Sequence, residues 1–152
     1  MEYLEEADRK TKIIDHMLYV TFPLIKDKKL LLKILSEAKI SIANCINSIL
    51  QYEYLNKNIN LSKDAKFNFK TFIEKCSKKY NISENEIKLI IELFEIAELH
   101  KQSPFEFSKG DKLIILTENM NQRDLTIDKV KEFLLLTKDI VRKTKASILR
   151  KI

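Results

Sequence analysis

The clearest pattern in the chain is the recurrence of apolar side chains every three or four positions, which places them along one side of an α-helix. It is strongest over residues 28–55, where the apolar positions are Leu31, Leu35, Ala38, Ile42, Cys45, Ile49 and Tyr52. The same spacing predicts further helices over about residues 3–22, 64–80, 84–102 and 127–151, and it places Phe67 and Ile91 among the expected core residues. We therefore expect a mainly α fold, a bundle of about five helices that share one apolar core.

Several sequence signals indicate where these helices begin and end. Pro23 predicts the end of the first helix, because proline lacks the amide hydrogen that a helix interior needs. The polar segment 56–64 is typical of a loop. Ser83 with Glu86 three residues later has the pattern of a capping box at the start of the fourth helix. Pro104 predicts that this helix stops shortly before it.

Residues 112–126 interrupt the helical pattern. The chain's only glycine precedes a β-branched run over residues 112–117, which favours a strand. A second short strand is expected over residues 123–126, so that the two form a β-hairpin, and Thr126 is in position to cap the last helix. A lone hairpin is marginal in water, so we expect the helices to cover one of its faces. No linker divides the chain, and residues 1–152 are expected to form one domain.

Composition supports a single helical domain and bounds the class of protein. Hydrophobic residues make up 45% of the 152 residues, which suffices for one core. Cys45 and Cys76 lie at apolar helical positions, so we expect neither a disulfide framework nor a cysteine-rich metal site. The longest apolar run, residues 17–25, is about half of the roughly 20 residues that a membrane-spanning helix needs. We expect a cytoplasmic protein that has no contact with membranes and no cofactor.

The formal net charge of +6 favours encounters with phosphate-rich partners such as RNA. The strongest basic surface is a stripe on the last predicted helix, at steps of seven, four and three residues: Lys131, Lys138, Arg142 and Lys145. Lys143, Arg150 and Lys151 extend it. Further nucleic-acid-binding residues are expected around the hairpin: Lys101, Lys109, Lys112 and Arg123. Only four of the 28 basic residues are arginine, so a lysine-rich composition also contributes to this pattern.

Two histidines limit the candidates for acid–base chemistry near neutral pH. His100 lies at the end of the fourth predicted helix, where it either takes part in chemistry or binds the last free carbonyl groups of the helix. Arg9 and His16 are two helical turns apart, so a phosphate-binding group and a proton-transfer group project from one face. Their apolar neighbours favour a coincidence. No repeated Glu-x-x-His pattern occurs, so we expect no metal site.

Two long helices, small residues within 40–46 and two further helices that end in a histidine resemble HEPN-type helical domains. The resemblance covers about residues 3–102. That family includes metal-independent RNases, toxin or antitoxin partners and inactive RNA-binding members. In the RNases, four to six residues separate an arginine from the histidine that follows it. His100 matches the histidine, but the positions of the arginine hold Leu93, Phe94 and Glu95, so the resemblance implies a non-catalytic relative.

We therefore expect a non-catalytic helical module that binds RNA or a protein partner through its basic last helix and the turn around residues 100–112. One alternative is a small metal-independent RNase that acts through His100, or through Arg9 with His16. The other is a structural protein that forms a homodimer. Its contacts would come from exposed apolar residues such as Tyr19, Tyr54 and Leu135.

Overall fold

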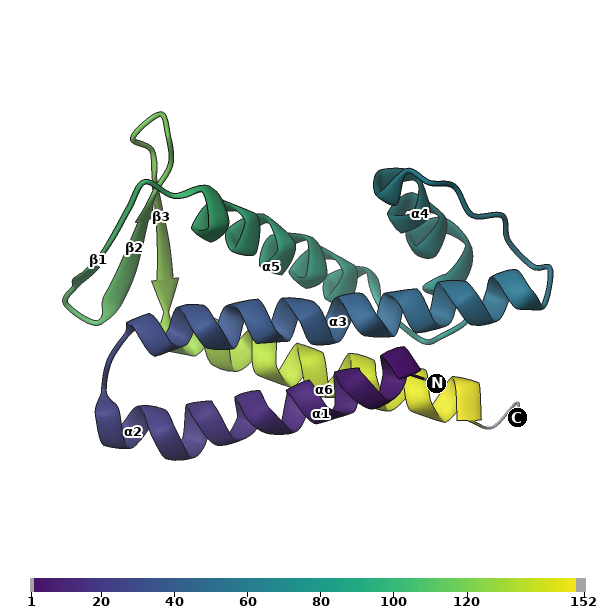
Figure 1. Ribbon diagram of the computed structural model, residues 1–152, viewed down its shortest axis with the longest axis horizontal. Coiled ribbons are helices and arrows are strands. Elements are labelled where there is room, and N and C mark those ends of the chain that lie inside the picture. The colour runs from purple at the N-terminus through teal and green to yellow at the C-terminus, as the bar shows by residue number, and fades with distance from the viewer. Residues whose placement is uncertain (1, 150–152) are drawn as a thin grey trace.

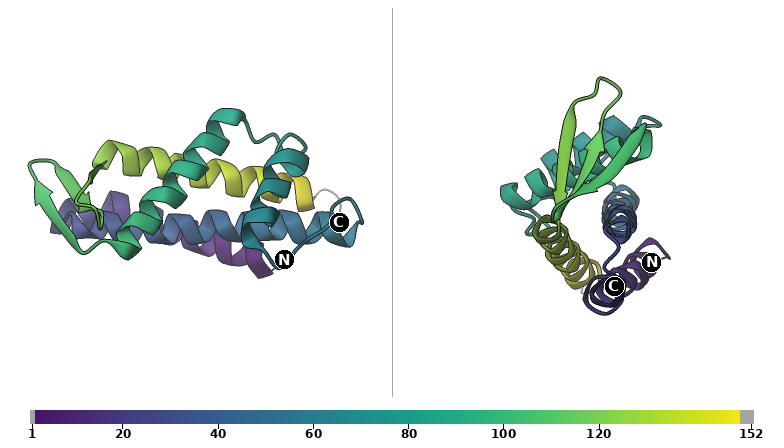
Figure 2. Two further views of the ribbon diagram at one scale, coloured as in Figure 1. Left: turned by 90° about the horizontal axis from the view of Figure 1, so that it is seen from above. Right: turned by 90° about the vertical axis from the view of Figure 1, so that its left-hand side faces the viewer.

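A computed structural model describes residues 2–149 and has a mainly α architecture with a small antiparallel sheet before the last helix (Figure 1). The central helix α3 (Lys29–Leu55) packs against α1 (Glu2–His16) and α6 (Ile127–Leu149). Above them, α5 (Glu84–Gln102) crosses the bundle at an angle (Figure 2). The short helix α4 (Ala65–Thr71) lies at the end of the bundle opposite to the sheet. The predicted fold class is thereby confirmed.

The core lies between α1, α3, α5 and α6, because each of these helices turns one apolar stripe inward. The periodic residues of α3 are buried, as predicted, with Tyr52 partly buried at their end. On α5 the buried stripe includes Leu93 and Ile96, whereas Ile91, which the spacing also placed inside, is exposed. Phe67, another expected core residue, is exposed on α4. Both corrections concern edges of a stripe, where periodicity does not distinguish the core from its rim.

A buried polar contact lets α1 and α3 approach closely. The Oγ atoms of Thr11 and Ser41 lie 2.9 Å apart, and both reach the carbonyl oxygen of Ala7, at 2.7 and 2.8 Å. All three residues are buried. Small side chains with mutually satisfied hydroxyl groups thus replace bulkier apolar residues at this crossing.

The prediction that the first helix ends at Pro23 is wrong. The helix continues through a wider π-helical segment, η1 (Met17–Thr21), into α2 (Phe22–Ile25). The amide of Phe22 bonds to the carbonyl of Met17, five residues back, and this wider turn makes room for the proline ring in the first turn of α2. Lys26 ends the helix with φ of 58°, a left-handed conformation.

The sheet has three strands rather than the two of the predicted hairpin. Strands β2 (Lys112–Leu116) and β3 (Gln122–Thr126) correspond to that hairpin, and β1 (Phe105–Lys109) is an additional edge strand in the order β1-β2-β3. Gly110, with φ of 62°, lies in the turn between β1 and β2. Phe107 of β1 faces Ile114 of β2 across an antiparallel ladder. The glycine that precedes the predicted hairpin therefore lies in the turn of a second hairpin, formed by β1 and β2.

The remaining helix boundaries follow the prediction with two differences. The third helix is shorter than expected, because α4 passes into a π-helical turn, η2 (Phe72–Cys76), and residues 77–81 are turns. The last helix is described as far as Leu149, so Arg150 and Lys151 lie outside the described residues. Among residues 2–149, none of the helices combines the length and the apolar character of a membrane-spanning segment. The cytoplasmic location stays a prediction.

Candidate functional site

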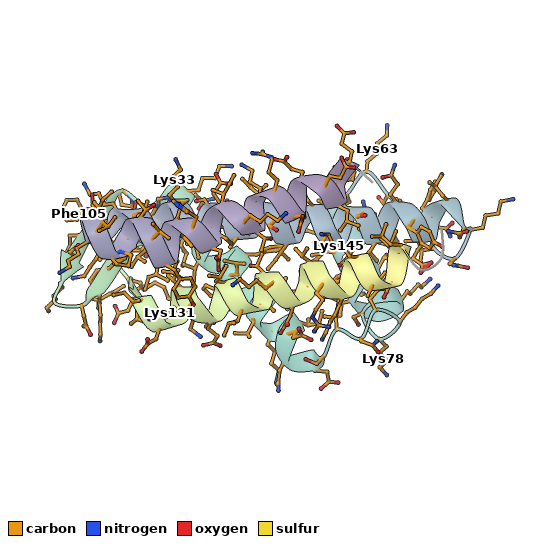
Figure 3. The ribbon with its side chains drawn as sticks, turned by 90° about the horizontal axis from the view of Figure 1, so that it is seen from below. Lys33, Lys63, Lys78, Phe105, Lys131 and Lys145 are labelled. Atoms are coloured by element: carbon orange, nitrogen blue, oxygen red, sulfur yellow. The ribbon has the colours of Figure 1, made fainter. Side chains whose placement is uncertain are left out.

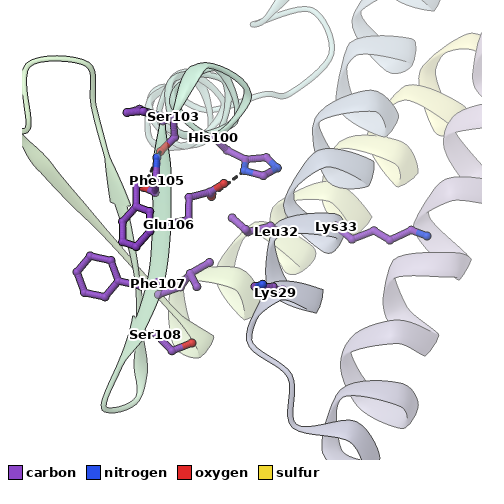
Figure 4. A pocket seen from close by; sticks show the side chains of 11 residues that line it. Lys29, Leu32, Lys33, His100, Ser103, Phe105, Glu106, Phe107 and Ser108 are labelled. Atoms are coloured by element: carbon purple, nitrogen blue, oxygen red, sulfur yellow. Dashed lines mark hydrogen bonds and ion pairs between the residues drawn. The ribbon is translucent and has the colours of Figure 1, made fainter.

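A pocket of about 530 Å³ lies at the end of the molecule that carries the sheet (Figure 4). The start of α3, the end of α5 and the edge strand β1 form its walls. We refer to it as the His100 pocket. It is lined by Lys29, Leu32, Lys33, His100, Ser103, Pro104, Phe105, Glu106, Phe107, Ser108 and Leu113. Because α3 and β1 are far apart in the sequence, only the folded chain assembles this site.

Within the pocket, His100 and Glu106 form a hydrogen-bonded pair. The distance between His100 Nδ1 and Glu106 Oε2 is 2.8 Å, and the two side chains are 28% and 20% exposed. Since an ionised carboxylate only accepts hydrogen bonds, Nδ1 is the donor in this contact, and Nε2 takes no part in it. The imidazole therefore binds the carboxylate of β1, and not the last carbonyl groups of α5 as one interpretation of the sequence proposed.

The chain between α5 and β1 explains why these two side chains meet. Ser103 leaves the helix in an extended conformation, as expected for the residue before Pro104. Its hydroxyl lies 2.6 Å from the carbonyl oxygen of Leu116 on β2, which holds the start of β1 beside the sheet. Side chains then alternate along β1, so Glu106 points toward His100 while the rings of Phe105 and Phe107 lie on the opposite side of the strand (Figure 4).

Two lysines line the His100 pocket, Lys29 and Lys33. Three more, Lys26, Lys101 and Lys109, lie within three residues of a lining residue in the sequence but are not part of the lining. In the part of the chain that the structure describes, none of these five lysines forms an ion pair. Lys28, by contrast, donates a hydrogen bond to the carbonyl oxygen of Gly110 and ties the start of α3 to the β1–β2 turn.

The other expected binding residues near the sheet are engaged in ion pairs. Lys112 lies 3.6 Å from Asp124 on the neighbouring strand β3. Arg123 lies 3.3 Å from Glu92 on α5. Of the four residues expected around the hairpin, Lys101 and Lys109 thus remain available for a ligand without the loss of an ion pair.

Much of the basic stripe on α6 is paired with acids of neighbouring helices. Lys138 lies 2.5 Å from Asp15, and Lys145 lies 2.9 Å from Asp8, so two ion pairs tie α6 to α1. The hydrogen bond from Lys145 is the main cause that holds the pKa of Asp8 below its usual value. Figure 3 shows Lys131 toward the sheet end of α6 and Lys145 farther along it.

Two further cations of this helix also have acidic neighbours. Lys143 lies 2.5 Å from Glu86 of α5, and exposed Arg142 lies 3.4 Å from Asp139 within α6. Among the four stripe residues, only Lys131 has no ion pair within residues 2–149. The stripe exists as the sequence placed it, but it is largely neutralised by these contacts.

Arg9 and His16 share a face of α1, as their spacing required, but the pocket that Arg9 borders does not include His16. Arg9 is exposed, and its guanidinium binds the carboxylate of Glu6 at 2.6 and 3.0 Å. The pocket that Arg9 borders is lined by acids of the first turns, including Glu2 and Glu5. An acidic surface does not suit a phosphate, so His100 is the histidine with the better chemical setting.

Sequence reasoning missed Glu106, Lys29 and Lys33. The alternation of Phe105, Glu106 and Phe107 was a signal for a strand that would have set the glutamate apart from the aromatic rings. No local signal, however, relates Lys29 to a strand more than seventy residues later. Among residues 2–149, no group of three or more His, Cys, Asp or Glu side chains is placed to hold a metal ion.

Comparisons with protein-family models, with curated proteins and with solved structures found no match for this chain. The resemblance to HEPN domains therefore stays a prediction. The case for a function depends on the His100 pocket and on the charges around it.

Proposed function

We propose that the chain is a non-catalytic module that binds single-stranded RNA, and that the His100 pocket is the centre of the binding surface. The observation that carries this proposal is that both lysines of the pocket lining, Lys29 and Lys33, form no ion pair within the described residues, while most cations of α6 are offset by acids. Each lysine that contacts a phosphate releases counterions, which is the main source of affinity for nucleic acids.

The shape of the site supports a flexible single strand. In Figure 4 the side chain of Lys33 extends away from β1, where it would meet the phosphate backbone outside the pocket. Phe105 is 58% exposed, and its ring lies 5.6 Å from that of Phe107, centroid to centroid, on the other side of β1. An exposed aromatic ring is a surface on which an unpaired base can stack, and here it lies next to the strand that lines the pocket.

Binding of a labelled single-stranded RNA, measured by fluorescence anisotropy, tests this proposal. We expect affinity to fall steeply with salt, and the double variant Lys29→Glu/Lys33→Glu to bind at least tenfold more weakly. The matched control is Lys63→Glu/Lys78→Glu, which makes the same change in net charge at exposed lysines away from the sheet (Figure 3). Salt-independent binding, or equal losses in the two variants, would overturn the proposal.

A metal-independent RNase is the second candidate, and the hydrogen bond between His100 and Glu106 is the observation that favours it. A carboxylate that orients an imidazole is a common arrangement for a general base, which here would use Nε2. Incubation of a mixed RNA pool with the purified protein and a chelator provides the test. Cleavage that disappears in His100→Ala supports this candidate, and intact RNA excludes it.

The alternatives of a protein partner and of a homodimer are also kept as proposals. Tyr19, Tyr54 and Leu135 are exposed, as contacts with a second copy require. The mass of the purified protein in solution distinguishes a monomer from a homodimer, and a mass equal to one chain would exclude the homodimer.

A further inference from the structure

From the chemistry of the His100 pocket, we infer that it selects guanine among the bases of a bound RNA, with Glu106 as the reading residue. This inference rests on the proposed RNA binding. It assigns a specific ligand group to a side chain that phosphate binding does not explain, because a carboxylate on the wall of the pocket repels phosphates.

Glu106 has acceptor capacity left for a ligand. Its Oε2 atom binds His100, and within the described residues no hydrogen bond to Oε1 is present. Each carboxylate oxygen accepts about two hydrogen bonds, so both oxygens remain available to a pair of donors. Its partner His100 also fixes the position of the carboxylate, since the imidazole projects from the last turn of α5 and Glu106 from the middle of β1.

Among the four bases of RNA, guanine alone offers two adjacent donors on its Watson–Crick edge, N1–H and the N2 amino group. Two parallel N–H groups match the two oxygens of a carboxylate, as the guanidinium group of arginine does. In adenine and cytosine an amino group lies beside a ring nitrogen that accepts, and this acceptor would face a carboxylate oxygen. Uracil has a single N–H between two carbonyl groups, so its carbonyl oxygens would meet the same repulsion.

The rest of the pocket suits the remaining groups of a guanine nucleotide. The Lys29 ammonium and the Ser108 hydroxyl lie on the pocket wall, where a donor is needed for the guanine O6 acceptor. Four consecutive residues of the edge strand, 105–108, line the pocket, and an edge strand has unpaired main-chain donors and acceptors along its outer side. A volume of about 530 Å³ lies in the usual range of pockets that hold small organic ligands.

A series of short oligouridine strands that differ only in one central nucleotide tests the inference. We expect the strand with guanine to bind about tenfold more tightly than those with adenine, cytosine or uracil, which is the usual value of a good bidentate contact to a base. Inosine keeps N1–H and O6 but lacks the N2 amino group, so its strand should bind with an intermediate affinity. These comparisons use the unmodified protein and do not depend on how a variant folds.

Glu106→Gln then identifies the residue that reads the base. An amide presents one donor and one acceptor, so the variant should lose the preference for guanine and retain the salt-dependent affinity for plain oligouridine. Lys33→Glu, at a side chain that extends away from β1, should instead weaken binding to every strand alike. If no strand binds, the proposed function itself fails. If the strands bind equally, or if the guanine preference survives in Glu106→Gln, only the inference of base selection is overturned.

Discussion

At the scale of single residues, the carboxylate of Glu53 at the C-terminal end of α3 is a buried charge whose desolvation must be offset by hydrogen bonds. Its side chain accepts hydrogen bonds from Lys79 (2.6 Å to Oε1), Asn58 (2.8 Å) and the Tyr80 hydroxyl (3.3 Å), and the residue is 1% exposed. Burial of a charge is costly unless hydrogen bonds compensate for the lost water. These contacts hold the loop after α3 and the turn after η2 against the helix.

We expect Glu53→Gln to lower the free energy of unfolding by about 2 kcal/mol, because hydrogen bonds to a charged group are stronger than those to an amide. Urea unfolding followed by circular dichroism measures the change. The control is Glu74→Gln, whose carboxylate is exposed and lies 3.9 Å from Lys70, and which should change stability by less than about 0.5 kcal/mol. Equal effects of the two substitutions would show that the buried network does not stabilise the fold.

The two buried thiols predict a loss of stability at alkaline pH. Burial raises the pKa of Cys45 to about 12 and that of Cys76 to about 11, from the ordinary value of 9.0 for a thiol. Above pH 9 the unfolded chain therefore releases protons that the folded chain keeps, so the free energy of unfolding falls as pH rises. For each thiol the fall is roughly 1 kcal/mol per pH unit between pH 9 and 11.

Cys45→Ala separates this effect from the titration of lysines. The variant starts from a lower stability, because it loses packing, but its stability should fall less steeply between pH 9 and 11 than that of the unmodified protein. Chemical unfolding at a series of pH values gives both slopes. Parallel curves for the two proteins would contradict the assignment of the alkaline transition to Cys45.

At the scale of elements, the start of α5 shows how a local motif and a distant residue act on the same helix. The Ser83 hydroxyl accepts from the Glu86 amide and the Glu86 carboxylate accepts from the Ser83 amide, both at 3.1 Å. Lys143 of α6 binds the same carboxylate. Burial alone would raise the pKa of Glu86, but the hydrogen bonds from Lys143 and Ser83 outweigh it and lower the pKa. The capping box thus also joins α5 to α6.

Ser83→Ala should lower the free energy of unfolding by about 1 kcal/mol, since one amide at the helix start then loses its partner. Thermal unfolding measures this change. A useful comparison is Ser83→Asp, which restores a side-chain acceptor and should recover much of the loss. If Ser83→Asp were as unstable as Ser83→Ala, the side-chain acceptor would not be the source of the stability.

Helices in which the apolar pattern repeats many times were predictable from the sequence, whereas the short edge strand β1 was missed. The stripe of α3 repeats over 27 residues, so neighbouring signals reinforce one another, and the capping box identified the start of α5 to within a residue. β1 has only five residues, and its formation depends on pairing with β2, which is a tertiary effect. The continuation of the helix through Pro23 required the π-helical turn η1, for which the sequence has no clear signal.

The candidate site was predictable only in part for the same reason. His100 was identified because it lies at a helix end beside a proline, which is local information. Its partner Glu106 depends on the direction of a strand that was not predicted, and Lys29 on the approach of α3 to that strand. The pairing of Lys145 with Asp8 likewise depends on the antiparallel packing of α6 and α1. A stripe of charge in a sequence does not show which charges the fold already neutralises.

At the scale of the whole molecule, some lysines are free to bind a ligand and others are held in ion pairs between helices. Lys29 and Lys33 of the His100 pocket form no ion pair among residues 2–149, whereas Lys138 and Lys145 tie α6 to Asp15 and Asp8 of α1. The double variant Lys138→Glu/Lys145→Glu replaces two attractions with two repulsions between these helices. We expect it to lower the free energy of unfolding by about 1 kcal/mol, since the four side chains are partly exposed and screened by solvent.

RNA affinity should respond differently from stability. Lys138→Glu/Lys145→Glu makes the same change in net charge as Lys29→Glu/Lys33→Glu. Any loss of RNA affinity that the two variants share is therefore due to the net charge of the whole protein. We expect the larger loss of affinity, measured by anisotropy at fixed salt, in Lys29→Glu/Lys33→Glu, and the larger loss of stability in Lys138→Glu/Lys145→Glu.

Adding Asp8→Lys and Asp15→Lys to Lys138→Glu/Lys145→Glu should restore its stability, because the ion pairs between α1 and α6 then form again with the charges exchanged. If α6 instead carried the binding surface, the α6 variant would lose more affinity than the pocket variant, and RNA binding would have to be assigned to the stripe.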